Sequence, residues 1–408
     1  MSERTDFDII VVGGGIVGLA SAYKITLSHP DIRIAVLEKE DKLAAHQTGH
    51  NSGVIHSGLY YEPGSHKAIT CAKGRKQMVS FAKRYRIPHE ICGKIIVATN
   101  QKELPNLEKI YNNSLQNEIE GIEKISPEQI GQIEPFCEGV AGIRVPCTGI
   151  IDFVKVAEKM AELIIAKGNK NKVLTDHEVT GFDKHDFYTN VLTNQGKFST
   201  KYIINCAGLQ SDRIAQADGV EPGVRIVPFR GDYYELNETA KEKVKALIYP
   251  VPDPKFPFLG VHFTRTVENT VECGPNAVFS FKREGYGKTD FNLADTWDAL
   301  SYRGTLKMFL KNIRYGLSEY VRAFSRKLFL RSLQRLIPTL RDEDITPCKS
   351  GVRAQAVDRK GKPVDDFKIE KRKNSIHVLN APSPAATASL AIGDYINEIA
   401  TKQFKLKD

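Results

Sequence analysis

The chain has 408 residues, 41% of them hydrophobic and 26% charged, so it is long enough for two or three domains and has the composition of a globular protein. Its net charge of +9 is concentrated between Lys282 and Arg341, which hold 13 basic and 5 acidic residues, and because no zinc-finger, RRM or KH signature accompanies them we exclude nucleic acid as a partner. The start of the chain has no signal-peptide pattern, no apolar run approaches the roughly 20 residues of a membrane span, and the seven cysteines are scattered, so we expect a soluble cytoplasmic protein with no metal site.

The chain opens on a strand, a glycine turn and the start of a helix. Residues 6–12 are an apolar, β-branched run of buried-strand length, and a helix-prone stretch begins at Leu19. In the intervening GxGxxG pattern the first glycine permits a tight turn, the second permits close approach of a pyrophosphate, and the third permits helix–strand packing. The candidate cofactor-binding residues here are Gly13, Gly14, Gly15, Ile16, Val17 and Gly18.

A second predicted strand, residues 31–37, ends on an acid, Glu38, with Lys39 beside it. A carboxylate at this distance from the glycines accepts both ribose hydroxyls of a dinucleotide and repels a 2′-phosphate, which argues against NADP. The alternative is a glycine turn between two buried strands followed by a chance acid. We place Glu38 and Lys39 among the cofactor-binding residues.

Small, polar and imidazole residues crowd the next stretch, HQTGHNSGVIHSGLYY at positions 46–61. This run resembles FAD-dependent oxidoreductases of the D-amino-acid oxidase type and, more narrowly, the L-2-hydroxyglutarate oxidase/dehydrogenase family. The resemblance implies FAD, with its pyrophosphate on the first turn and its flavin beside residues 48–56. His56 is either a catalytic base or a histidine that only orients the cofactor. The implied cofactor-binding residues are Thr48, Gly49, His50, Asn51, Ser52 and Gly53.

Residues 67–85 predict a helix that leads out of the first unit, and residues 86–144 predict an insertion. The insertion has a strand over 91–98 and a helix that begins at Ser126, with proline at its first position and Gln129 completing a capping box. We interpret the insertion as scaffold without chemistry.

After a predicted helix over 153–167 and strands near 172–174 and 178–182, the chain carries a second dinucleotide signature. The strand at 202–206 ends in Ala207-Gly208, and an acid, Asp212, lies on the following helix. This pattern resembles the second cofactor element of the superfamily, although a plain strand-to-helix turn looks similar. The resemblance adds Val179, through its backbone at the adenine, and Ala207, Gly208 and Asp212 to the cofactor-binding residues.

From Glu221 the pattern changes to strands, predicted over 225–236, 258–265 and 270–278. Alternation along the second of these places His262 and Thr264 on one face and Phe263 and Arg265 on the other. His262 is therefore the better catalytic candidate, and Arg265 is either a substrate ligand or half of an ion pair.

The basic segment, at about 300–337, carries apolar residues every three or four positions with lysines and arginines between them. This pattern predicts one or two amphipathic helices. Such helices bind an anionic membrane surface, or they dock on their own domain with a solvated basic side.

The carboxyl-terminal part resembles the closing motif of the family. Gly351 lies in a strand-like stretch, and a loop of small residues leads from the last strand into a helix predicted over 385–399. The amino terminus of that helix would lie near the flavin pyrimidine and stabilise the reduced ring. The implied cofactor-binding residues here are Gly351, Ser383, Pro384, Ala385 and Ala386.

Oxidation of a 2-hydroxy acid removes the hydroxyl proton and transfers a hydride from Cα to flavin N5, which requires a base and a carboxylate clamp. His262 and His56 are the candidate bases, and the sequence does not choose between them. Guanidinium and phenol groups suit the clamp. The candidate substrate-binding residues are Tyr60, Tyr61, Arg230, Arg265 and Arg353.

Together these patterns predict an α/β protein: a Rossmann-type, D-amino-acid-oxidase-like FAD-binding domain (1–85, 145–220 and 345–408) and a mixed β-sheet substrate domain (86–144 and 221–344). The resemblance implies oxidation of L-2-hydroxyglutarate to 2-oxoglutarate, with electrons passed to oxygen or to a membrane quinone. Peripheral attachment to the inner face of the cell membrane is an open alternative to a free cytoplasmic protein. An amine or glycine oxidase, a glycerol-3-phosphate dehydrogenase and a flavin-binding redox sensor without turnover are the alternatives.

Overall fold

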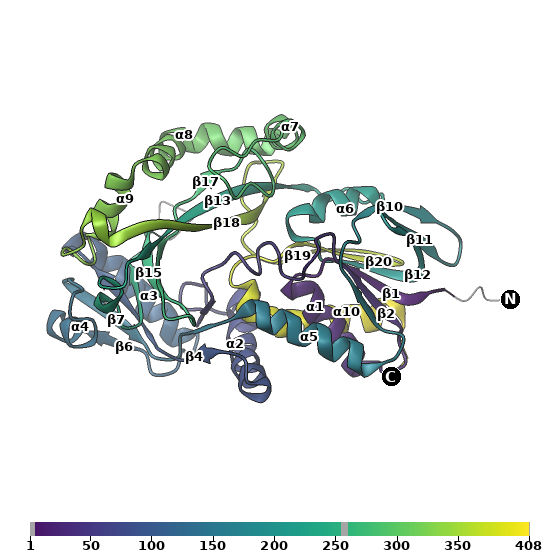
Figure 1. The fold of residues 1–408 in the computed structure, drawn as a ribbon, viewed down its shortest axis with the longest axis horizontal. Coiled ribbons are helices and arrows are strands. Elements are labelled where there is room, and N and C mark those ends of the chain that lie inside the picture. Colours follow the sequence, from purple (N-terminus) through teal and green to yellow (C-terminus); the bar gives the residue numbers. More distant parts are fainter. Residues whose placement is uncertain (1–4, 254–259, 408) are drawn as a thin grey trace.

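Two large β-sheets lie side by side in the computed structural model, which describes residues 5–253 and 260–407 (Figure 1). The first sheet has the strand order β10-β11-β12-β1-β2-β9, and β20 and β19 continue it from β12. Its members are β1 (Phe7–Val12), β2 (Ile34–Leu37), β9 (Lys172–Leu174), β10 (Val179–Lys184), β11 (Thr189–Thr193), β12 (Gly196–Asn205), β19 (Lys368–Arg372) and β20 (Ser375–Asn380). The strands β20, β12, β1, β2 and β9 are parallel to their neighbours in this group, as the predicted dinucleotide fold requires.

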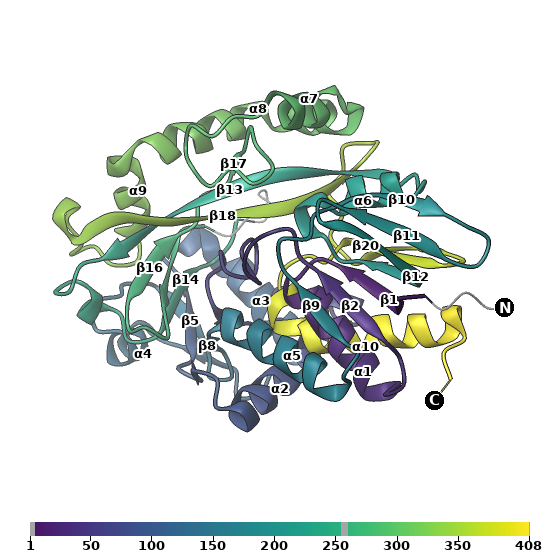
Figure 2. The ribbon, with the colours of Figure 1, turned by 45° about the vertical axis from the view of Figure 1, so that its right-hand side comes forward.

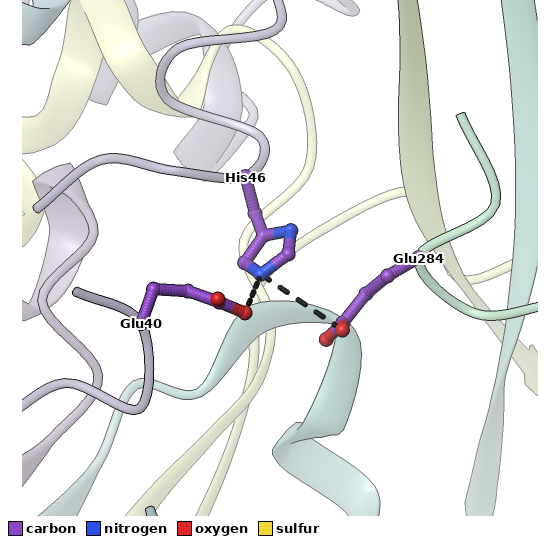
Figure 3. Close-up of side chains that lie close together, drawn as sticks. All are labelled: Glu40, His46 and Glu284. Carbon is purple, nitrogen blue, oxygen red and sulfur yellow. Dashed lines mark hydrogen bonds and ion pairs between the residues drawn. The ribbon is translucent and has the colours of Figure 1, made fainter. Parts of the chain in front are cut away.

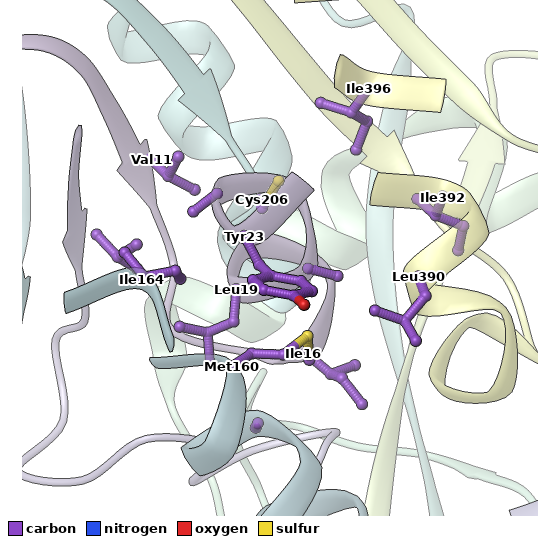
Figure 4. Close-up of a cluster of buried hydrophobic side chains, with 14 of the residues drawn as sticks. Val11, Ile16, Leu19, Tyr23, Met160, Ile164, Cys206, Leu390, Ile392 and Ile396 are labelled. Atoms are coloured by element: carbon purple, nitrogen blue, oxygen red, sulfur yellow. The ribbon is translucent and has the colours of Figure 1, made fainter. Parts of the chain in front are cut away.

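Strand β1 is buried on both faces from Ile9 to Val12, which is why this part of its sequence is apolar throughout. Ile9 and Val11 pack into a core formed by α1 (Ile16–Ser28), α5 (Phe153–Lys167) and α10 (Ala385–Phe404), whereas Ile10 and Val12 pack with residues of β10 and β11 on the other side. Figure 4 shows the first of these cores, where side chains of α1, α5 and α10 meet. The glycine turn is therefore held between a rigid strand and a rigid helix.

The second sheet has the order β17-β13-β16-β15-β14-β5-β7-β6, with β18 beside β13. Its members are β5 (Lys94–Ala98), β6 (Glu123–Ile125), β7 (Ala141–Val145), β13 (Val224–Leu236), β14 (Leu247–Pro250), β15 (His262–Arg265), β16 (Val271–Gly274), β17 (Val278–Phe279) and β18 (Ile345–Asp358). The long pair β13 and β18 reaches from one lobe toward the other (Figure 2). Because β18 pairs along its whole length with β13, residues 345–358 lie in this second sheet, and the domain division stays a prediction.

Helices and a small sheet complete the molecule. The small sheet has the order β3-β8-β4, with β3 (Val54–Ile55), β4 (His89–Glu90) and β8 (Gly149–Ile151). The remaining helices are α2 (His66–Tyr85), α3 (Leu104–Gln116), α4 (Pro127–Ile133), α6 (Ser211–Ala217), α7 (Leu293–Ser301), α8 (Arg303–Phe324) and α9 (Arg326–Leu333). Figure 1 shows α7, α8 and α9 as a layer outside β13, β17 and β18.

Several local predictions are confirmed. Helix α5 has the predicted bounds, and α4 begins at Ser126 with both hydrogen bonds of the capping box. Helices α8 and α9 occupy the predicted basic segment. The predicted strand over 258–265 forms from His262, and its first two positions lie outside the described residues.

Candidate active site

The glycine turn has the geometry that the sequence predicts. Gly13 has φ +110°, and a Cβ there would lie 2.5 Å from the carbonyl oxygen of Cys206 at the end of β12. A Cβ on Gly18 would lie 2.1 Å from the carbonyl oxygen of Gly13, so helix and turn are in direct contact. On Gly15, by contrast, a Cβ would meet only the hydroxyl of Thr48 within 4 Å, at 3.5 Å. The backbone at Gly15 therefore leaves room for a phosphate to approach.

Two acceptors organise the groups around this turn. The amide of Ile16 donates to Thr48 Oγ1 at 3.0 Å, and the amide of Gly14 donates to Glu38 Oε2 at 2.8 Å. The other carboxylate oxygen of Glu38 accepts from the amide of Glu40 at 3.0 Å. Helix α1 has no acidic residue in its first turn, so the positive end of its dipole remains available to an anion.

The loop at 46–53 is braced by its own polar groups. Asn51 donates to the carbonyl oxygens of Gln47 and Thr48 and accepts from the amide of Gly53, which has φ +64°. His50 Nδ1 contacts the carbonyl oxygen of Ser350 at 2.9 Å, and a Cβ on Gly351 would lie 2.3 Å from the carbonyl oxygen of His50. The loop is thereby fixed against β18.

The loop also contacts the second dinucleotide element and the last helix. Gly208 has φ +52°, and a Cβ there would lie 2.9 Å from Gln47 Oε1. At the start of α10, Thr387 Oγ1 accepts from the amide of His56 at 3.1 Å and donates to the carbonyl oxygen of Val54 at 3.1 Å. Segments near residues 13, 50, 208 and 387 therefore meet around one loop.

Asp212, a predicted cofactor-binding residue, lies in an ion pair inside the protein. Its carboxylate is fully buried and forms a two-point ion pair with Arg283, with Oδ2 2.9 Å from Nη2, and it also accepts the amide of Ile226 at 2.9 Å. Arg283 is itself 1% exposed and also contacts Asp298 at 2.7 Å. Because its partner is a buried guanidinium, these contacts describe an ion pair inside the protein, and the cofactor role of Asp212 stays a prediction.

Lys39 lies in a charged cluster with three other side chains, Glu40, His46 and Glu284, which Figure 3 shows without the lysine. His46 Nε2 contacts Glu40 Oε1 at 2.7 Å, and the ammonium of Lys39 bonds to Glu40 and lies 3.0 Å from Glu284 Oε2. Lys39 thus supplies the positive charge between the two carboxylates. The cluster joins the segment after Glu38 to the loop at 284, which comes from the other lobe.

His262 and His56 lie in one cluster with Lys94, Tyr249 and Arg353, which we call the histidine cluster. The ring of His262 stacks on that of Tyr249 with centroids 3.9 Å apart. Burial lowers the pKa of both imidazoles to about 3, and the charges of Lys94 and Arg353 act in the same direction on each. Both rings are therefore neutral between about pH 5 and 8.

A hydrogen bond fixes the tautomer of His262. Its Nδ1 lies 2.8 Å from the carbonyl oxygen of Gly260. Because a carbonyl oxygen only accepts, Nδ1 carries the proton and Nε2 is an unprotonated acceptor. In the described part of the chain, no hydrogen bond fixes the tautomer of His56 in this way. His262 is thus the imidazole prepared to receive a proton.

The predicted carboxylate clamp is only partly assembled. Arg353 is exposed and acts electrostatically on both histidines. Tyr60 and Tyr61 are neighbours in the chain, and the Lys94 ammonium lies 5.2 Å from the centroid of the Tyr60 ring. Arg230, however, is buried in an ion pair with Asp232, with Nε 2.9 Å from Oδ1. Arg265 pairs with Glu90 at 3.2 Å, on the strand face opposite His262. These two arginines therefore form ion pairs within the protein, and their substrate role stays a prediction.

Lys94 was not predicted, because we interpreted its segment as scaffold. It opens β5, its side chain is 2% exposed, and its ammonium lies 4.6 Å from the ring centroid of Tyr249. The available signal was a single charge at the start of an otherwise apolar strand, Lys94-Ile-Ile-Val-Ala. Charged residues at such positions are rarely buried without a specific reason.

Residues 8–399 match the model of a family described as FAD dependent oxidoreductase. The chain is 48% identical over 400 residues to a protein named L-2-hydroxyglutarate dehydrogenase from Indibacter alkaliphilus, covering 98% of this chain and 100% of that one. It is 43% identical over 422 residues to the human protein named L-2-hydroxyglutarate dehydrogenase, mitochondrial, covering 99% of this chain and 91% of that one. These similarities confirm the resemblance that the run at 46–61 indicates.

Solved structures share the fold. L-α-glycerophosphate oxidase from Mycoplasma pneumoniae, with FAD bound, superposes with a TM-score of 0.78 at 22% identity and covers 97% of this chain and 94% of that one. Glycine oxidase from Geobacillus kaustophilus superposes with a TM-score of 0.72 at 15% identity, covering 99% and 96%. The predicted fold class, a D-amino-acid-oxidase-like FAD-binding fold joined to a mixed sheet, is confirmed.

Proposed function

The chain belongs to the FAD dependent oxidoreductase family, and from this premise we propose that it oxidises L-2-hydroxyglutarate to 2-oxoglutarate. The observation that carries the proposal is the similarity, along nearly the whole chain, to proteins named L-2-hydroxyglutarate dehydrogenase. The histidine cluster supports it, since a neutral imidazole beside two cations suits an anionic alcohol.

The residues around the glycine turn fit FAD. The open backbone at Gly15 and the uncompensated amino terminus of α1 suit the pyrophosphate, and the buried carboxylate of Glu38 suits a ribose. We propose that the FAD site comprises the predicted residues around this turn together with others that the family resemblance implies. They are Gly13 to Gly18, Glu38, Thr48 to Gly53, Val179, Ala207, Gly208, Gly351 and Ser383 to Ala386.

When bound, FAD supplies the two-electron acceptor of the reaction. The chain's own task is to take the hydroxyl proton, and Nε2 of His262 is the acceptor prepared for it. In the free protein the low pKa makes this imidazole a weak base. The two carboxylates of the substrate add negative charge beside the cations of the cluster, which raises the pKa of the imidazole and favours proton transfer.

The substrate panel tests this function directly. We expect L-2-hydroxyglutarate to bleach the flavin absorbance of the purified protein under anaerobic conditions, because the reaction transfers two electrons to FAD. Glycine, D-amino acids and glycerol 3-phosphate should leave the spectrum unchanged at the same concentrations. Bleaching by one of these compounds alone would assign the chain to another oxidase class, and no bleaching by any of them would favour a redox sensor.

We also propose that the layer of α7 and α8 attaches to an anionic membrane surface, where a quinone would accept the electrons. In α8 the apolar residues that recur every three or four positions point outward, and Leu310 is 71% exposed. Trp297 of α7 is 73% exposed. Arg314 and Leu317 continue this spacing in the sequence, and their side chains lie outside the described part of the structure. The outward stripe comprises Leu306, Leu310, Ile313, Val321 and Phe324.

Basic side chains gather near the start of α8. A surface cavity of about 570 Å³ at the start of α8 is lined by Arg225, Arg303, Lys307, Arg359 and Lys360, with Glu221 as the acidic member. Each basic residue close to an anionic lipid surface contributes about 1 kcal/mol to binding. None of the helices in the described ranges has both the length and the hydropathy of a membrane span, so we propose attachment at the surface.

Replacing Trp297 and Leu310 together by glutamate should release the protein from vesicles of anionic phospholipid. We expect partitioning to fall about tenfold or more, because two large apolar side chains no longer enter the lipid and two negative charges face it. Sedimentation with sucrose-loaded vesicles measures the effect. Phe187, 89% exposed on the turn between β10 and β11, provides the control, and Phe187→Glu should sediment as the wild type does. Wild-type protein that stays in the supernatant would contradict the proposal.

A further inference from the structure

A buried ammonium without a counter-ion lies in the histidine cluster. Lys94 Nζ has no hydrogen-bond acceptor and no ion-pair partner in the described part of the chain. Its nearest described neighbours include two aromatic faces, the ring of Tyr249 at 4.6 Å and the ring of Tyr60 at 5.2 Å. Aromatic faces attract a cation but cannot replace the hydrogen bonds that water gives it.

The titratable groups around Lys94 do not compensate its charge. The groups that favour its charged form are two thiols, Cys147 and Cys71. The others are phenols, imidazoles or cations. Burial accordingly lowers the pKa of Lys94 to about 7. The groups that act electrostatically with it are Cys71, Cys147, His56 and His262, with Arg353 acting on the same two histidines.

The backbone holds Lys94 in this position. Strand β5 lies between β14, in parallel register with Leu247 opposite Lys94, and β7, in antiparallel register with Val145 opposite Lys94. The rest of β5 is fully buried in the sheet. The strand pairing therefore fixes the backbone position from which the side chain of Lys94 enters the cluster, where the residue is 2% exposed.

We propose that Lys94 is a substrate-binding residue whose ammonium receives one carboxylate of the dicarboxylate, so that Lys94 and Arg353 bind the two ends of a molecule whose hydroxyl faces the histidines. This inference rests on the proposed function for the identity of the substrate. A carboxylate supplies both the hydrogen-bond acceptors and the negative charge that Lys94 lacks among the described residues. The desolvated lysine then selects acids over neutral alcohols of similar size.

A carboxylate that binds Lys94 must also restore its proton. Because the pKa of the free lysine is about 7, most of the protein carries a neutral Lys94 at pH 8. A bound carboxylate favours the ammonium and raises the pKa. Ligand binding at pH 8 should therefore take up about one proton from the buffer, and affinity should fall as pH rises above about 7.

Calorimetric titration of the FAD-loaded protein with glutarate tests this linkage. Glutarate has the same two carboxylates without the hydroxyl, so it binds without turnover. Titrations at pH 8 in two buffers of different ionisation enthalpy give the number of protons taken up. For wild type we expect about one proton. For Lys94→Met we expect no uptake and glutarate binding about 10- to 100-fold weaker. Lys94→Arg should bind glutarate without proton uptake, because a guanidinium stays protonated.

Two further comparisons keep the test decisive. Lys124 provides a control, because it is a lysine over an aromatic ring outside the cluster. Its ammonium lies 4.8 Å from the ring centroid of Tyr111 and pairs with Glu108. Lys124→Met should therefore match wild type. At pH 6, where Lys94 is mostly charged, ligand-free Lys94→Met should unfold at a higher temperature than wild type, because an unpaired buried charge is removed.

Wild-type proton uptake that persists in Lys94→Arg, or unchanged glutarate affinity in Lys94→Met, would overturn the role of Lys94. Failure of wild type to bind glutarate would overturn it as well, and if Lys94→Met does not fold the arginine variant still decides. The substrate panel tests which compound is oxidised, whereas the proton count tests whether Lys94 gains a proton when a carboxylate binds. Proton-linked glutarate binding without bleaching by L-2-hydroxyglutarate would reject the proposed substrate and retain the carboxylate site.

Discussion

His262→Ala should slow anaerobic flavin reduction by L-2-hydroxyglutarate about 10²- to 10⁴-fold while FAD remains bound, because the hydroxyl proton loses its acceptor. The bond from Nδ1 to the carbonyl oxygen of Gly260 prepares Nε2 for this proton. Stopped-flow absorbance at the flavin band gives the rate, and the visible spectrum gives the FAD content. His56→Ala should slow reduction as well, since His56 lies in the same electrostatic cluster.

His185 is a suitable control, because it lies on the turn between β10 and β11 and contacts Asp183 at 3.1 Å. His185→Ala should reduce its flavin at the wild-type rate. Near-normal reduction in both His262→Ala and His56→Ala would remove histidine as the base.

The same pair of histidines predicts the acid side of the pH profile. A base acts in its neutral form, and the pKa of each free imidazole is about 3. The second-order rate constant of flavin reduction, which reports the free protein, should therefore stay constant between about pH 5 and 6.5. A decline centred near pH 6.5, the ordinary pKa of histidine, would show that burial does not hold these rings neutral.

Asp212→Ala should lower the free energy of unfolding by about 3–5 kcal/mol, because it leaves the guanidinium of Arg283 buried without its two-point partner. Asp298 pairs with the same arginine at 2.7 Å and retains part of the interaction. Urea unfolding of the apoprotein, followed by tryptophan fluorescence and circular dichroism, measures the change.

The pair Glu221 and Arg359 is the matched surface control. Both side chains are about 70% exposed, and Glu221→Gln should change the free energy of unfolding by less than about 1 kcal/mol. If Asp212→Ala instead unfolds like wild type but no longer binds FAD, Asp212 has the cofactor role that its sequence pattern indicates, and the structural role assigned to it is wrong.

The sequence by itself determined the elements whose causes are local. The strand–glycine–helix unit at 6–28, the acid at Glu38, the capping box at Ser126 and the bounds of α5 all follow from residues within a few turns of one another. Alternation along β15 likewise places His262 and Arg265 on opposite faces of the strand. Their contacts agree with this, since His262 stacks on Tyr249 and Arg265 pairs with Glu90. Patterns with local causes are readable because propensity, periodicity and capping act over short distances.

Only the tertiary structure decided which charges have partners. Asp212 and Arg283 are 71 residues apart, and Lys94 faces Tyr249 from a segment that sequence patterns mark as scaffold. The outward apolar stripe of α8 is a further case, since periodicity predicts an amphipathic helix but not which face the protein covers. Burial and ion pairing depend on residues brought together from distant parts of the chain, and a charge that finds a partner there is structural, whereas one that finds none is available to a ligand.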